Sequence, residues 1–253
     1  MSIIARSIYD FGLAVIFIAS CLILIQLART GQRKIQVRRI PAIEALEEMV
    51  GRAAETGQSF YMATSYSGPQ SWPAFASGLA CLNKISEYAA GANVEVKAFT
   101  WATDAIPLLE ENIRLGFLKG GHPELFDRTR MVEYLPGQDA GNYEVVDHLT
   151  RGKPGACAWV GAYGYEAAVF ATVGSLAGAV QIGGTPTYRY IPVFAASCDY
   201  TLLGEELYAA TAHIREDPVS MNTLAAQDII RVIIIALMVI TIILYNTSGA
   251  TIL

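Results

Sequence analysis

The chain has 253 residues, a formal net charge of −5 and 53% hydrophobic residues. This acidic balance argues against nucleic acid as a partner, because duplex binding requires a basic face that neutralises phosphates. The four cysteines show no CxxC or Cys-His spacing, so we expect small core hydrophobes in a reducing compartment rather than disulfides or metal ligands. The expected core hydrophobes are Cys81, Cys157 and Cys198, whereas Cys21 lies inside an apolar run near the N-terminus.

Two uncharged apolar runs lie at opposite ends of the chain, over residues 11–28 and 232–253. A helix needs roughly 20 apolar residues to cross the hydrocarbon core of a bilayer. Each run is therefore predicted to be a transmembrane helix, with the lipid bilayer as a partner. Neither run contains Asp, Glu, Lys, Arg or His, which favours inert anchors over a transport pathway.

Charge asymmetry around the first run predicts its orientation. A cluster of Lys and Arg follows the run, whereas only Arg6 precedes it, and such clusters stay on the cytoplasmic side. The cluster consists of Arg29, Arg33, Lys34, Arg38 and Arg39. A removable signal peptide is the alternative, disfavoured because Asp10 interrupts the start and no small-x-small cleavage site follows.

The predicted organisation has four parts. Residues 1–28 form an N-terminal transmembrane helix, and residues 29–40 form a basic juxtamembrane segment. Residues 41–218 form a cytoplasmic domain, and residues 219–253 form a linker with a C-terminal transmembrane helix.

The domain begins with an amphipathic helix at Pro41, in which Ile43, Leu46, Met49 and Val50 recur at helical spacing. Strand-like runs then alternate with helical runs. The expected strands are 59–63, 94–100, 131–134, 156–160 and 179–182. The expected helices are 72–90, 105–118, 140–151, 166–176, 191–197 and 200–213. This alternation builds βαβ units. We predict an α/β fold, a Rossmann-like open parallel sheet of about five strands, flanked by the two transmembrane helices.

Ligands of such sheets bind the loops at the carboxyl ends of the strands. These loops are rich in glycine, hydroxyl and aromatic residues, which suit a small molecule held by stacking and neutral hydrogen bonds. The candidate ligand-binding residues are Ser65, Tyr66, Ser67, Gly68, Trp101, Thr103, Asp104, Tyr163, Gly164, Glu166, Gly183, Gly184 and Thr185. The sequence identifies no particular cofactor.

Two glycine-rich stretches have competing explanations. Residues 161–164 and 183–185 resemble backbone anion sites, but the full G-x-G-x-x-G spacing is absent. A tight turn that needs the conformational freedom of glycine is the favoured explanation of the first stretch, and a close-packed chain reversal is the favoured explanation of the second. Glu166 fits the first turn of a helix, where a carboxylate suits the dipole.

The aromatic residues near the strand ends are also ambiguous, because stacking faces for a base and an oligomer contact have the same composition. These residues are Tyr66, Trp72, Trp101, Tyr163 and Tyr165.

The sequence offers little for catalysis. The histidines, His122, His148 and His213, are far apart in the chain, so we predict neither a triad nor a metal cluster. Asp104 and Asp139 are explained as helix caps.

A carboxylate-rich segment precedes the second apolar run. Asp199 is expected to cap a helix. Glu205 and Glu206 either lie near the interior, where Arg189 or a neighbouring subunit would pair with them, or form a solvated helix face.

Residues 160–166, 178–185, 191–194 and 198–210 resemble a bacterial family of unknown function, DUF6754, associated with the Chloroflexota. The resemblance implies a membrane-associated Rossmann-like domain and brings no catalytic residues. We expect a non-catalytic scaffold in the bacterial inner membrane that self-associates or joins other subunits. A membrane-tethered sensor of a nucleotide or another small ligand is the alternative, and an enzyme is the least favoured class.

Overall fold

The computed structural model describes residues 12, 15, 18, 19, 22, 23, 26, 40–65, 68–215, 231, 232, 234–236, 238 and 239. The chain divides into two compact units, Arg38–Arg215 and a second unit of Met1–Val37 with Glu216–Leu253. Most residues of the two predicted spans lie outside the described residues, and those that are described are helical. Within the described part of the chain, no helix combines the length and the apolar character that crossing a bilayer requires.

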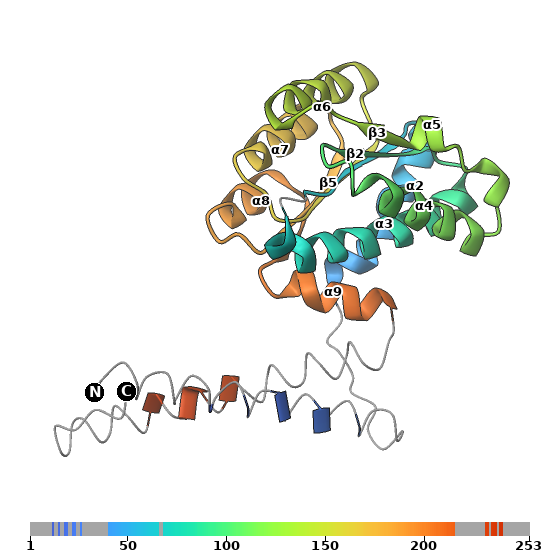
Figure 1. Cartoon of the computed structure of the whole chain (residues 1–253). Helices are drawn as coiled ribbons and strands as arrows, with labels where there is room; N and C mark the ends of the chain where they lie inside the picture. Colours follow the sequence, from blue (N-terminus) through green and yellow to red (C-terminus); the bar gives the residue numbers. More distant parts are fainter. Residues whose placement is uncertain are drawn as a thin grey trace, which may run out of the picture. The chain divides into compact units, whose positions relative to one another are not determined.

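The Arg38–Arg215 unit is built on an open sheet whose described strands are all parallel (Figure 1). The strands are β1 Phe60–Ala63, β2 Val96–Thr100, β3 Val132–Tyr134, β4 Ala156–Val160, β5 Val180–Thr185 and β6 Tyr200–Leu203. Their order is β3-β2-β1-β4-β5-β6. The strand order reverses between β1 and β4, which is the topological switch point of a doubly wound sheet. The predicted Rossmann-like parallel sheet is confirmed, with six strands instead of about five.

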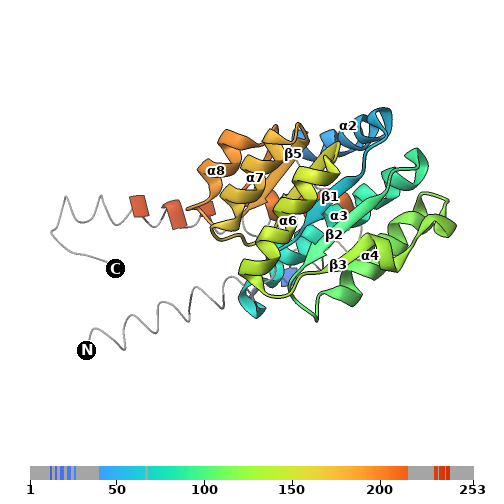
Figure 2. The ribbon, with the colours of Figure 1, turned by 90° about the horizontal axis from the view of Figure 1, so that it is seen from above.

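Helices cover both faces of this sheet (Figures 1 and 2). One face carries α2 Pro41–Thr56, α3 Trp72–Ala92, α4 Ile106–Lys119 and α9 Glu206–Arg215. The other carries α6 Gln138–Gly152, α7 Glu166–Leu176 and α8 Ile191–Ser197. Short helical turns complete the connections: η1 Pro69–Ser71, η2 Pro123–Leu125 and α5 Arg128–Met131.

Strand β1 contributes side chains to the hydrophobic cores on both faces of the sheet. All four of its residues are buried. Phe60 and Met62 pack toward α2 and α3, whereas Tyr61 and Ala63 pack toward α6 and α7. This period-2 alternation with apolar residues on both faces is typical of a central parallel strand.

The amphipathic helix predicted at Pro41 is confirmed as α2, which buries Ile43, Leu46, Met49 and Val50. It ends at Gly57, whose φ of 65° lies in the left-handed region. The Gly57 N–H bonds back to the last turn, which is a common helix ending because glycine has no Cβ to oppose this conformation.

The helix predicted over residues 200–213 is wrong in its first part. Tyr200–Leu203 form β6, Gly204 turns the chain with a φ of 58°, and α9 begins at Glu206. Asp199 is not a helix cap. Its carboxylate accepts a hydrogen bond from Gln181 N (2.8 Å), and its own N–H donates to Gln181 O (3.0 Å), which holds β6 beside β5.

The two glutamates after β6 lie on a solvated surface. Glu205 and Glu206 are both exposed. The solvated helix face is therefore confirmed over the buried alternative, and Arg189 is likewise exposed.

Strand β5 is longer than predicted, so Gly183 and Gly184 lie within the strand and not in a loop after it. A Cβ at Gly183 would lie 2.5 Å from the ring of Phe194, and one at Gly184 would lie 3.1 Å from Leu202. These glycines are explained by close packing, because α8 and β6 approach the strand backbone directly. Neither a chain reversal nor an anion-binding turn occurs at these two positions.

Gly78 of α3 allows a similar close approach, because a Cβ there would lie 2.8 Å from the carbonyl oxygen of Val160 at the end of β4. We expect Gly78→Ala to lower the free energy of unfolding by about 1–3 kcal/mol, since a backbone oxygen cannot move aside as a flexible side chain can. The measurement is urea denaturation of the full-length chain in detergent, with tryptophan fluorescence as the signal of unfolding.

The matched control is Gly51→Ala in α2, where a Cβ would meet nothing within 4 Å. This variant is expected to gain up to about 1 kcal/mol, because alanine is the better helix former. Equal effects of the two substitutions would contradict the close contact between α3 and β4.

Candidate functional site

The chain segments that follow β1 and β4 contact each other at the switch point. Ser65 is buried, and its hydroxyl donates to Ala162 O at 2.8 Å. A Cβ at Gly161 would lie 2.7 Å from Ser65 N, so glycine is required there for the two segments to meet. The place where a doubly wound sheet usually opens toward a ligand is bridged here by a direct hydrogen bond.

Thr64 lies beside this bridge and faces a helix. It is 2% exposed, and within residues 40–65 and 68–215 its hydroxyl has no hydrogen-bond partner. The hydroxyl lies against the backbone of Gly78 in α3. Thr64 therefore belongs to the packing between β1 and α3.

Tyr163, a predicted ligand residue, is part of the core. It is 2% exposed, and its ring packs edge-on against Phe170 and Phe194, with a centroid distance of 5.5 Å to Phe194. Its hydroxyl donates to Ala63 O. Burial, aided by the charge of Glu166, raises the pKa of Tyr163 well above its ordinary value. This ring offers no free face to a base.

Glu166 is a buried carboxylate at the carboxyl edge of the sheet, with 1% of its surface exposed. One oxygen accepts from Gly164 N–H at 2.8 Å, and the other accepts from the Gln138 side-chain amide at 3.3 Å. The start of α7 favours negative charge through its dipole. Glu166 thereby connects the start of α7 with the start of α6.

A second connection runs parallel to the first. The Tyr165 hydroxyl donates to Asp139 and accepts from the Asn142 amide at 3.1 Å. The hydrogen bond to Asp139 raises the pKa of Tyr165. Gln138 and Asn142 were absent from the candidate list, although their i, i+4 spacing places them on one face of α6.

The other candidates are spread along the edge. Trp101 is half-buried against the α6–α8 core, while Thr103 and Asp104 are exposed in the turn before α4. Gly68, with a φ of 110°, precedes η1. The Thr185 hydroxyl accepts from Thr187 N–H at 3.2 Å.

Tyr66 and Ser67 lie outside the described residues. The capping roles predicted for Asp104 and Asp139 are wrong, because the N-cap residues of α4 and α6 are Ala105 and Gly137.

The fold also brings together charged residues that are distant in the chain. Lys97 of β2 forms an ion pair with Glu133 of β3, and Glu133 lies 2.8 Å from His148 Nε2 of α6. Glu144, one turn before His148, completes a group whose Glu and His ligand atoms lie within 4.8 Å of one another. The Lys97 ammonium lies 3.4 Å from His148 Nδ1, so this group already has the positive charge that a metal ion would bring. We interpret this group as an electrostatic link between α6 and the edge strand.

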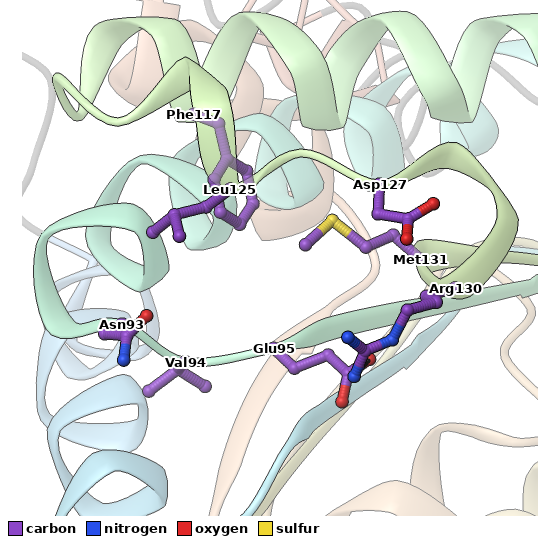
Figure 3. Close-up of a pocket in the computed structure, with 8 residues that line it drawn as sticks. All are labelled: Asn93, Val94, Glu95, Phe117, Leu125, Asp127, Arg130 and Met131. Atoms are coloured by element: carbon purple, nitrogen blue, oxygen red, sulfur yellow. Dashed lines mark ion pairs between the residues drawn. The ribbon is translucent and has the colours of Figure 1, made fainter.

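Two hollows on the α3–α4 side of the sheet are lined by described residues. The first holds about 200 Å³ beyond the amino end of β2 (Figure 3). Phe117, Leu125 and Met131 give it apolar walls, and an ion pair of 3.0 Å joins Arg130 to Glu95 at its rim. The second holds about 250 Å³ between α3, α4 and α9. Neither lies at the carboxyl edge.

The family model described as Domain of unknown function (DUF6754) matches residues 4–253. The chain belongs to this family. The predicted membership of DUF6754 is thus confirmed over nearly the whole sequence. No match was found among curated proteins or among solved structures.

The charged group predicts a pH dependence. Although burial alone favours its neutral form, hydrogen bonds from Lys97 and His148 lower the pKa of Glu133. A lowered pKa in the folded state stabilises the protein above the ordinary value of 4.5, and this contribution is lost as the pH falls through the folded-state value. Glu133→Gln should lower stability by about 0.5–1 kcal/mol near neutral pH, discounted for partial solvent exposure.

The difference between wild type and Glu133→Gln should shrink as the pH falls toward about 4. Urea denaturation of the full-length chain at several pH values measures this. Glu55→Gln, at an exposed position of α2, is the control and should not change the pH profile. A difference that stays constant with pH would show that the Glu133 charge contributes nothing.

Proposed function

We propose that this protein is a non-catalytic, membrane-anchored scaffold whose α/β domain self-associates through the carboxyl edge of its sheet. The observation that carries the proposal is a set of exposed aromatic side chains at this edge, which we call the carboxyl-edge rim. It consists of Trp72 (46% exposed), Tyr134 (45%), Tyr165 (49%) and Tyr188 (80%).

The rim has the composition of a protein interface. Tyrosine and tryptophan are enriched where proteins meet, because they bury a large apolar area and keep a polar group for hydrogen bonding. Tyr134 is the last residue of β3, and the other rim residues follow β1, β4 and β5, so the rim is a band and not a single point. A band of this kind supports contact with a macromolecular surface, for which a second copy of the chain is the simplest choice.

The residues beneath the rim support assembly over ligand binding. Ser65 and Ala162 bridge the switch point, Tyr163 is buried, and Glu166 accepts two internal hydrogen bonds. These residues, which could otherwise bind a small molecule, thus form hydrogen bonds or packing contacts within the domain.

The anchoring part of the proposal depends on the two apolar runs and on charge. Described helical residues of both runs expose aliphatic side chains, including Ile18 (57%), Leu22 (62%) and Val232 (66%). Exposed aliphatic surface on a helix is unfavourable in water, and lipid would cover it. The basic segment at residues 29–40 favours a cytoplasmic domain at a bacterial inner membrane.

Two anchors also assist association. Tethering at both ends confines the domain to a layer beside the bilayer, which raises the effective concentration of other copies. A modest contact through the rim would then be sufficient to hold neighbours together.

A membrane-tethered sensor of a nucleotide or another small ligand is the second candidate. It is favoured by the position of Glu166 at the carboxyl edge, where a ligand hydroxyl could replace the Gln138 amide (3.3 Å) as a hydrogen-bond donor to the carboxylate. Thermal-shift screening of the full-length chain against nucleotides tests it. A specific rise in melting temperature that Glu166→Gln abolishes would favour sensing over assembly.

The self-association proposal is tested with Tyr134→Ser combined with Tyr188→Ser, two rim positions outside the internal hydrogen bonds described above. We expect the dissociation constant between copies to rise by at least about tenfold, since each aromatic contact at an interface contributes on the order of 1 kcal/mol or more. Mass photometry of the full-length chain in detergent measures the distribution of oligomers.

The matched control is Leu118→Ser combined with Leu176→Ser, which removes exposed apolar side chains (51% and 82%) at the C-terminal turns of α4 and α7, at the opposite edge of the sheet. This variant should assemble as the wild type does. A wild-type chain that is monomeric at every concentration would refute the proposal.

A further inference from the structure

We propose that the hollow between α3, α4 and α9 binds a phosphate group, that of an anionic phospholipid headgroup. This inference rests on the proposed membrane anchoring and adds a specific partner to it. The hollow holds about 250 Å³, which is small for a drug-sized ligand but suits a headgroup.

Positive charge predominates around this hollow. Lys84, Lys119 and Arg215 line it together with a single carboxylate, that of Glu87. Lys84 forms an ion pair with Glu87 at 3.1 Å, so Lys119 and Arg215 are the excess positive charge among the described residues that line the hollow. Within residues 40–65 and 68–215, neither of these two exposed side chains has an ion-pair partner.

The hollow also has ordered polar walls. Lys119 Nζ donates to the side-chain oxygen of Asn83 at 2.9 Å, and the Asn83 amide donates to Asn112 O at 2.8 Å. This chain of hydrogen bonds holds the Lys119 ammonium at the wall. A phosphate could then bind between Lys119 and Arg215 without a large rearrangement of the lysine.

The apolar lining favours a lipid over free phosphate. Leu115 and Ile214 line the same hollow and are only partly buried. Apolar surface adjacent to cations matches a headgroup with its glycerol and upper acyl chain. Inorganic phosphate would use only the charged half of such a site.

The position of Arg215 supplies the reason for a lipid to be nearby. Arg215 ends α9, and the chain continues from there through residues 216–231 to the second predicted span. Under the proposed anchoring, this linker confines the domain to the neighbourhood of one bilayer, where headgroups are abundant, so even a weak site would be occupied.

A purely structural explanation of the two cations exists, because each lies in the last turn of its helix and therefore complements the helix dipole. That explanation predicts an effect on stability and none on lipid binding. The experiment must therefore measure bound lipid directly.

Native mass spectrometry of the full-length chain in detergent, with added phosphatidylglycerol or phosphatidylcholine, provides this measurement. In Lys119→Gln combined with Arg215→Gln, the affinity for phosphatidylglycerol should fall by about tenfold, since each cation near a lipid phosphate contributes appreciably. The small retention of phosphatidylcholine should not change.

The matched control is Arg151→Gln combined with Lys153→Gln at the end of α6. It removes the same charge on the opposite face of the sheet and should bind phosphatidylglycerol as the wild type does. Equal phosphatidylglycerol binding by all three proteins would overturn the inference. Displacement of the lipid by inorganic phosphate of similar affinity would overturn its assignment to a headgroup.

A separate experiment would show that the anchoring proposal is wrong. An alkaline carbonate wash that strips the wild-type chain from native membranes would refute anchoring, whatever lipid the purified protein retains. Retention of the chain after the wash, together with equal lipid binding by the variants, would refute the headgroup site alone.

Discussion

The direct contact between the segments that follow β1 and β4 is the constraint on which the rest of the domain depends. The strand order places these two strands side by side in the middle of the sheet, and helices cover both faces of the sheet. At their carboxyl ends, the hydrogen bond from Ser65 to Ala162 and the absence of a Cβ at Gly161 allow the segments to meet. A larger residue at Gly161 would force them apart.

This contact determines which residues remain available at the carboxyl edge. With the switch point bridged, Tyr163 turns into the core, and Glu166 joins the starts of α6 and α7. Aromatic side chains farther out, such as Tyr134 and Tyr188, stay exposed. The polar groups thus stabilise the edge, and the aromatic groups give it a surface suited to a partner. The proposed role as a scaffold follows from this division.

The fold class could be predicted because apolar periodicity is a local property. The spacing of Ile43, Leu46, Met49 and Val50 identified α2, and alternating strand and helix runs identified the parallel sheet. Strand β6 was not predicted, because the spacing of apolar residues in Tyr200–Leu203 continues the helical pattern of the carboxylate-rich segment that follows. The hydrogen bonds of Asp199 to Gln181, which define this strand, depend on β5.

The arrangement of the site was less predictable, because it too depends on contacts between elements that are distant in the sequence. The positions of Gly183 and Gly184 in a strand are explained by Phe194 and Leu202, residues that approach only in the folded domain. The grouping of Lys97 with His148 required the strand order, which one sequence does not reveal. Periodicity reports which face of an element is buried, whereas these contacts depend on which elements are neighbours.

The most direct test of this account is a cryo-electron microscopy map of the full-length protein in a lipid membrane. The account predicts that neighbouring copies meet through the rim of Trp72, Tyr134, Tyr165 and Tyr188, with the segments after β1 and β4 in contact beneath it. Copies that stand apart with this rim facing solvent, or a small molecule bound between β1 and β4, would contradict it.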